Sequence, residues 1–175
     1  MRVRPAARDD LAALARLTQR CAISQRDWAG PETPVPGLAA EELEWELRFA
    51  RTGAWLAVAV DDEDPEAPIV GACAFATATV SREARTLVPD LAHVNAVFVD
   101  PDHWRRGIAR LMLDAAETAM VAGGHRRAQL WTLEGSPAEH LYRALGWKAD
   151  GRREVYPPMR LTVVAYVKSL PARRT

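Results

Sequence analysis

A basic turn, residues 104–109 with the sequence WRRGIA, stands between a run of apolar residues and a helical pattern. The first amides of a helix have no partners within the helix, and the helix dipole makes the same end positive. Gly107 allows close backbone approach. Three arginines add charge where an anion would bind: Arg105, Arg106 and Arg110. The turn predicts a phosphate site, although such turns also occur as solvated surface.

A second polar cluster opens a short helical pattern over residues 136–146. Ser136, Pro137 and Glu139 match an N-cap serine, a first-turn proline and a capping-box glutamate. Tyr142 follows on the apolar side of the pattern. A phenol with the ordinary pKa of ~10 keeps its proton at neutral pH, as a general acid must. The alternative is that Tyr142 only packs in the core.

The residue types leave a general base open. His93 and Asn95 lie two apart in a strand pattern and are expected to share one face of it. The ordinary pKa of histidine makes His93 the leading base, with a structural hydrogen bond as the alternative. Glu134 is a weaker choice, and a chain of water molecules to solvent would also serve.

Hydrophobic patterning predicts the elements that must position these residues. Strands are predicted at residues 2–4, 55–60, 69–80, 93–99, 129–133, 148–155 and 161–167, the last as an edge strand. Helices are predicted from Asp9 or Asp10 to before Trp28, along Leu43, Leu47 and Ala50 to Gly53, from Ile108 to Gly123, and over residues 136–146. Loops are predicted at residues 30–37 and 61–68.

Two motifs in this order resemble those of the GCN5-related N-acetyltransferase (GNAT) family. Its acetyl-CoA motif, a strand ending in V-x-P and then Q/R-x-x-G-x-G/A at a helix start, is matched by residues 99–101 and 104–109. Its second motif, N-x-x-A followed by a helical tyrosine and L-G-F/W, is matched by Ala138, Tyr142 and residues 145–147. The resemblance extends more loosely over nearly the whole chain, in the order β-α-α-β-β-β-α-β-α-β-β.

The sequence departs from these motifs at two positions. Trp104 stands where the family has glutamine or arginine. Gly135 stands where the family often has an asparagine that contacts the pantetheine arm, and Ser136 is expected to substitute for it.

The resemblance implies an α/β (α+β) fold: a single domain over residues 1–170 with a central, mixed, mostly antiparallel sheet flanked by helices, and a tail at residues 171–175. It implies an enzyme that transfers an acetyl group directly from acetyl-CoA to a primary amine of a small molecule or peptide. Tyr142 would be the general acid and His93 the possible general base. The implied cofactor-binding residues are Val97, Phe98, Val99, Arg105, Arg106, Gly107, Ile108, Ala109, Arg110, Ser136 and Tyr142. The alternative is a non-catalytic acyl-CoA-binding regulatory module of the same fold.

Composition narrows the expected partners. The 175 residues include 23 basic and 23 acidic ones, so no global field favours nucleic acid or an anionic membrane. Cys21 and Cys73 lack metal-site spacing, and no metal is expected. Neither a signal-peptide core nor an apolar run of ~20 residues occurs, so a cytoplasmic protein is expected, as a monomer or homodimer.

Overall fold

The chain forms a seven-stranded mixed sheet. The computed structural model describes residues 1–60, 67–81, 86–157 and 159–172. The strands are β1 (Arg2–Pro5), β2 (Trp55–Val60), β3 (Gly71–Thr79), β4 (Leu87–Val99), β5 (Arg127–Leu133), β6 (Lys148–Tyr156) and β7 (Leu161–Ser169), in the spatial order β1-β2-β3-β4-β5-β7-β6. Only β4 and β5 are parallel, and the helix between them makes the crossover that a parallel pair requires.

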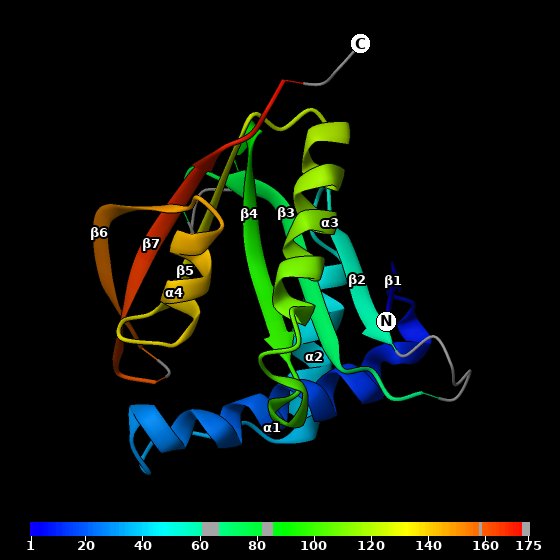
Figure 1. The fold of residues 1–175 in the computed structure, drawn as a ribbon, viewed down its shortest axis with the longest axis vertical. Coiled ribbons are helices and arrows are strands. Elements are labelled where there is room, and N and C mark those ends of the chain that lie inside the picture. Colours follow the sequence, from blue (N-terminus) through cyan, green and yellow to red (C-terminus); the bar gives the residue numbers. More distant parts are fainter. Residues whose placement is uncertain (61–66, 82–85, 158, 173–175) are drawn as a thin grey trace.

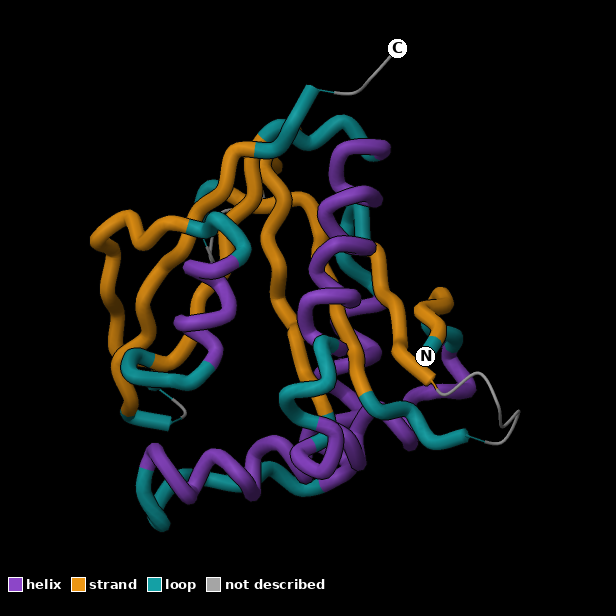
Figure 2. The backbone as a smooth tube through the Cα atoms, in the orientation of Figure 1, coloured by secondary structure: helices purple, strands orange, loops and turns teal. Residues whose placement is uncertain are grey.

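Four helices cover the two faces of the sheet (Figure 1). They are α1 (Leu11–Ala29), α2 (Leu38–Phe49), α3 (Ile108–Ala122) and α4 (Ala138–Ala144). In Figure 2, α3 lies in front of β3 and β4 and α4 lies in front of β5 and β7, whereas α1 and α2 lie behind. No helix among the described residues is long and apolar enough to cross a membrane.

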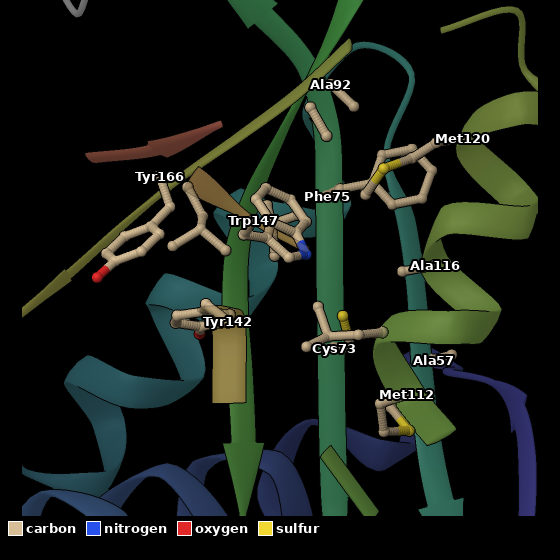
Figure 3. Close-up of a cluster of buried hydrophobic side chains, with 14 of the residues drawn as sticks. Ala57, Cys73, Phe75, Ala92, Met112, Ala116, Met120, Tyr142, Trp147 and Tyr166 are labelled. Carbon is tan, nitrogen blue, oxygen red and sulfur yellow. The ribbon is translucent and has the colours of Figure 1, made fainter. Parts of the chain in front are cut away.

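Each face of the sheet carries its own core. Beneath α3 and α4, the buried side chains Met112, Met120 and Trp147 pack against β3, β4 and β7 (Figure 3). On the other face, Leu14, Leu17 and Trp45 pack against β2, β3 and β4. The sheet is therefore held by apolar burial on both sides.

The sequence predicted the fold class and the element order, and both are confirmed. The β2 strand has the predicted bounds, and α3 starts and ends as the apolar spacing predicts. Residues 61–66 of a predicted loop and residues 173–175 of the expected tail lie outside the described residues.

Four sequence predictions are wrong in detail. α1 continues through Trp28 to Ala29. Strand β7 is interior, because β6 pairs along it and takes the edge position. Leu43 and Leu47 on α2 are 55% and 51% exposed, since Trp45 is the side chain that α2 buries. The predicted capping box at Ser136 does not form, as described below.

Candidate active site

β4 and β5 separate about halfway along their length. They pair only from Leu91 to Val94 on β4 and from Arg127 to Leu130 on β5. Beyond these residues β5 stays paired with β7 alone, and Figure 1 shows β4 and β5 diverging toward the end where α3 begins. The last five residues of β4 therefore have a free edge that faces a V-shaped opening in the sheet.

The free edge begins at a β-bulge. Ala96 pairs with Ala74 on β3, and Val94 pairs with Phe75, so Asn95 is an extra residue in β4. Its Oδ1 atom is buried and has no hydrogen-bond partner among the described residues. The regular alternation that placed His93 and Asn95 on one face is interrupted here.

The register decides which backbone groups face the opening. The amide of Asp100 donates to the carbonyl of Val70 at 2.9 Å, so hydrogen-bonded pairing with β3 recurs at every second residue of β4. By this alternation the backbone groups of Phe98 point toward β3, and those of Val97 and Val99 point into the opening. The Phe98 side chain lies on the face of the sheet away from α3, and its ring centre is 6.1 Å from that of Trp45.

The predicted phosphate turn lies at the wide end of the opening, where α3 starts. Gly107 precedes α3 with a φ of 78°, and no side chain caps the helix. The first amide bonded to the turn is that of Leu111, which donates to the Gly107 carbonyl, so the amides of Ile108, Ala109 and Arg110 remain open. Arg105 also has a positive φ, 62°, which is uncommon for a residue with a side chain.

Trp104 and α1 hold this turn in place. The Trp104 indole donates to the Val99 carbonyl at 2.8 Å, and the Cys21 thiol donates to the same oxygen at 3.2 Å. Arg20 on α1 bonds to Asp100 at 2.9 Å and to Asp102 at 2.6 Å. An indole N–H thus supplies the donor at a position where the sequence motif has glutamine or arginine.

Tyr142 lies beside the free edge of β4. Its ring is 6% exposed and packs 6.2 Å from Trp147 and 5.9 Å from Tyr166. Figure 3 places it close to the level of Cys73, which pairs with Val97. Burial, with a smaller contribution from the Cys73 thiol, raises the pKa of Tyr142. Its hydroxyl makes no hydrogen bond with a described residue.

The start of α4 differs from the predicted capping box. Pro137 is the N-cap, and the buried Ser136 hydroxyl lies 3.1 Å from that of Thr132. The Glu139 carboxylate accepts from the Gly135 amide at 2.7 Å and from the hydroxyl of Tyr166. Gly135 adopts a φ of 77°, and this geometry turns its amide toward Glu139.

His93 lies on the opposite face of the sheet from α3. Its neighbours Ala92 and Val94 belong to the core beneath α3, so the alternation of a strand points His93 the other way. It pairs laterally with Gln129 of β5 and is half-buried. Glu134 is tied to Arg153 at 2.6 Å. Tyr142 and the His93 side chain therefore lie on opposite faces of the sheet.

Comparison with known proteins identifies this arrangement. The family model described as "Acetyltransferase (GNAT) family" matches residues 18–147. The chain belongs to the GNAT acetyltransferase family. Its members are acetyltransferases that use acetyl-CoA, and this GNAT chain is an acyltransferase. No curated protein sequence gives a significant match.

Solved structures share the GNAT fold. A ribosomal-protein-alanine N-acetyltransferase from Brucella melitensis is 18% identical, with 97% of this chain and 100% of that chain covered and a TM-score of 0.72. The candidate acetyltransferase yncA from Salmonella typhimurium, solved with its cofactor acetyl-CoA, is 15% identical over 100% and 96%, with a TM-score of 0.70. A GCN5-related N-acetyltransferase from Kribbella flavida is 17% identical over 97% and 97%, with a TM-score of 0.71.

The described residues of this GNAT chain fit acetyl-CoA. Apart from Gly107 itself and its two chain neighbours, no heavy atom lies within 4 Å of the position where a Cβ on Gly107 would stand, so the space beside the turn before α3 is open. The backbone of Val97 offers a donor and an acceptor to an extended amide chain. Among the described residues, no group of three or more metal-ligating side chains occurs.

Proposed function

We propose that this GNAT chain binds acetyl-CoA in the opening between β4 and β5 and transfers the acetyl group directly to a primary amine. One observation carries the proposal: the free edge of β4 runs from Tyr142 to the uncapped start of α3. A ligand with an extended amide arm and a pyrophosphate matches both ends of this path.

The cofactor would be held mainly by backbone groups. The pantetheine amides would add to β4 as a short strand, bonded to the carbonyl of Val97 and to the amide of Val99. The carbonyl of Val99 already accepts from Trp104 and Cys21, so we assign it no cofactor bond. The pyrophosphate would accept from the open α3 amides, with Arg105, Arg106 and Arg110 adding charge.

The chemistry needs an oxyanion donor and a proton for the leaving group. The neutral amine attacks the thioester carbonyl, forming a C–N bond as the C–S bond breaks. The Val97 amide, which faces the opening, would stabilise the oxyanion, whereas that of Phe98 points toward β3. Tyr142 would protonate the departing thiolate, since its raised pKa keeps the phenol protonated. His93, or water beside it, would take the proton that the amine loses.

The acceptor would approach from the face that α3 does not cover. A cavity of about 330 Å³ opens there between Trp28 at the end of α1 and the ends of β5 and β7, lined by Leu133, Glu134 and Thr162. Both a small-molecule amine and a peptide amine fit an opening of this kind.

A thiol-release assay over a panel of amines, peptides and aminoglycosides tests the proposal. We expect free CoA to appear only when both acetyl-CoA and an acceptor are present. Binding of acetyl-CoA without turnover on any acceptor would contradict the proposed acetyl transfer and favour a regulatory acyl-CoA-binding module.

A further inference from the structure

Arg48 brings a positive charge to the acceptor face of the sheet. Its side chain is only 16% exposed, and its guanidinium lies 5.0 Å from the ring centre of Trp45. Trp45 in turn packs edge-on against Phe98 of β4. Arg48 follows Trp45 about one turn later on α2.

A second contact places the level of Arg48 along β4. Just after α2, the carbonyl of Thr52 accepts from the amide of Thr77 on β3, and Thr77 pairs with Ala92 of β4. Arg48 lies between Trp45 and Thr52 in the chain. Its backbone therefore lies between these two contacts, one of which reaches β4 at Phe98 and the other β3 at Thr77.

Neighbouring carboxylates compensate this guanidinium only in part. Its Nη1 atom is buried and makes no hydrogen bond with a described residue, and it lies 3.6 Å from a carboxylate oxygen of Glu44. Glu44 is itself 57% exposed, and Glu41 is a more distant acidic neighbour. Burial lowers the pKa of Arg48 despite the opposing effect of Glu44. A buried cation without a bonded anion is costly, so an anionic ligand group would stabilise it.

A second guanidinium borders the same face from β6. Arg152 donates to Gln129 at 3.1 Å and lies 5.3 Å from the ring centre of Trp131. Gln129 is the β5 partner of His93. Arg152 is also bonded to Asp150, whose charge balances it. Arg48 thus keeps a buried Nη1 atom without a hydrogen bond, whereas Arg152 is already bonded to Asp150.

We propose that Arg48 binds a carboxylate of the acceptor, so that the acceptor class is a primary amine that also carries a carboxylate, with free amino acids as the simplest members. The inference rests on the proposed function, because it concerns the acceptor half of the same active site. A planar guanidinium can pair with a carboxylate through two parallel hydrogen bonds. Its charge also disfavours a second cation nearby, which promotes loss of the proton that the acceptor amine must give up.

Matched acceptors provide the test. Thiol release is measured with the common L-amino acids and with the same amino acids as carboxamides, which retain the amine and lack the negative charge. We expect kcat/KM for the best carboxylate acceptor to exceed that of its carboxamide about 10- to 100-fold, the size of a charge-assisted hydrogen bond. Arg48→Met should remove this preference through KM and leave the dissociation constant of acetyl-CoA within about twofold.

Two further variants keep the result interpretable. Arg48→Lys retains a cation and should keep part of the preference even if Arg48→Met folds poorly. Arg51→Met removes an exposed charge just beyond α2 and should leave the preference unchanged. Equal turnover of carboxylates and carboxamides, or an equal loss of both in Arg48→Met, would overturn the proposal.

A binding measurement separates this inference from the proposed function. If no acceptor releases CoA, titration calorimetry of the acetyl-CoA-loaded protein with the same amino acids still reads out the site. Binding that is lost in Arg48→Met and kept in Arg51→Met would support Arg48 as a carboxylate site while the transferase proposal fails. Absence of binding to the unaltered protein would overturn the carboxylate site itself.

Discussion

At the scale of single residues, Tyr142 is the side chain on which the proposed chemistry depends most directly. Tyr142→Phe should lower kcat about 10²-fold, the lower end of what a general acid contributes, with little change in acetyl-CoA affinity. The hydroxyl has no hydrogen-bond partner among the described residues, so its removal should leave the melting temperature nearly unchanged. Stopped-flow or steady-state thiol release, together with calorimetry for acetyl-CoA, measures both quantities.

The pH profile gives a second readout of the same residue. Because burial raises its pKa, Tyr142 keeps its proton above the ordinary value near 10. The rate of the unaltered enzyme should therefore show no alkaline decline from Tyr142 below about pH 10. A kcat that survives in Tyr142→Phe would remove the phenol from the mechanism.

Tyr142 and the turn at Gly107 could be proposed from the sequence, because each belongs to a local motif of the GNAT family whose spacing is visible there. Arg48 and the bulge at Asn95 could not be found in that way. Arg48 reads as an ordinary helix charge until the structure shows its burial on Trp45. A bulge changes the pairing of two strands by one residue, and this depends on the partner strand as much as on Asn95.

At the scale of elements, the start of α3 is the proposed phosphate site, and Gly107 is the residue to test. Gly107→Ala must place a side chain at a φ of 78° and put a methyl group into the open space before the helix amides. We expect the dissociation constant of acetyl-CoA to rise about tenfold or more, with a stability loss of about 1 kcal/mol from backbone strain.

Gly151→Ala is the matched control, because Gly151 has a φ of 87°, equally open surroundings and a place in the exposed strand β6. It should lose similar stability and bind acetyl-CoA normally. Equal affinities in both alanine variants would argue against a phosphate at the α3 terminus.

Glu139 joins three elements, because its carboxylate accepts from the turn at Gly135, from Arg143 on α4 and from Tyr166 on β7. Burial alone would raise its pKa, but these donors outweigh burial and lower it below the usual value near 4.5. A carboxyl with a lowered folded-state pKa stabilises the fold above its unfolded-state pKa and loses this contribution as pH falls through the folded-state pKa.

Glu139→Gln should therefore lower the free energy of unfolding at pH 7 by about 2 kcal/mol, in the range of hydrogen bonds to a charged group. The difference from the unaltered protein should narrow as pH falls below about 4. Urea denaturation at pH 7 and below pH ~4 measures this difference in the free energy of unfolding. Glu32→Gln is the control, because Glu32 is exposed in a loop. A difference that does not depend on pH would contradict the charged state assigned to Glu139.

Hydrophobic periodicity predicted the elements well where one face is buried, as in α3, whose stripe of Ile108, Met112 and Ala116 faces the sheet. It failed for α2, where Leu43 and Leu47 form a regular stripe that the structure leaves exposed. A single large side chain, Trp45, orients that helix instead, and periodicity weights the stripe of Leu43, Leu47 and Ala50 more than one tryptophan. The position of β7 inside the sheet was likewise hidden, because strand order depends on tertiary pairing.

At the scale of the whole molecule, the opening in the sheet lacks hydrogen bonds that a bound ligand can supply. Apart from the Val99 carbonyl, the backbone groups on the free edge of β4 pair with no described strand. A ligand that adds hydrogen bonds to that edge should stabilise the folded state, because it binds this state and not the unfolded chain.

Acetyl-CoA at 100 times its dissociation constant should therefore raise the free energy of unfolding by about 2.7 kcal/mol, the value that mass action requires. Thermal unfolding with acetyl-CoA, with CoA and with pantetheine separates the contributions of the two ends of the site. Pantetheine lacks the pyrophosphate, so it should raise the melting temperature less than CoA does at equal concentration. High salt should reduce the increase caused by CoA more than the increase caused by pantetheine, because salt screens the exposed arginines of the turn. Equal increases in melting temperature with CoA and with pantetheine would mean that the start of α3 contributes nothing to binding. If acetyl-CoA raises the melting temperature but no amine causes thiol release, the protein would be a binding module and not a transferase.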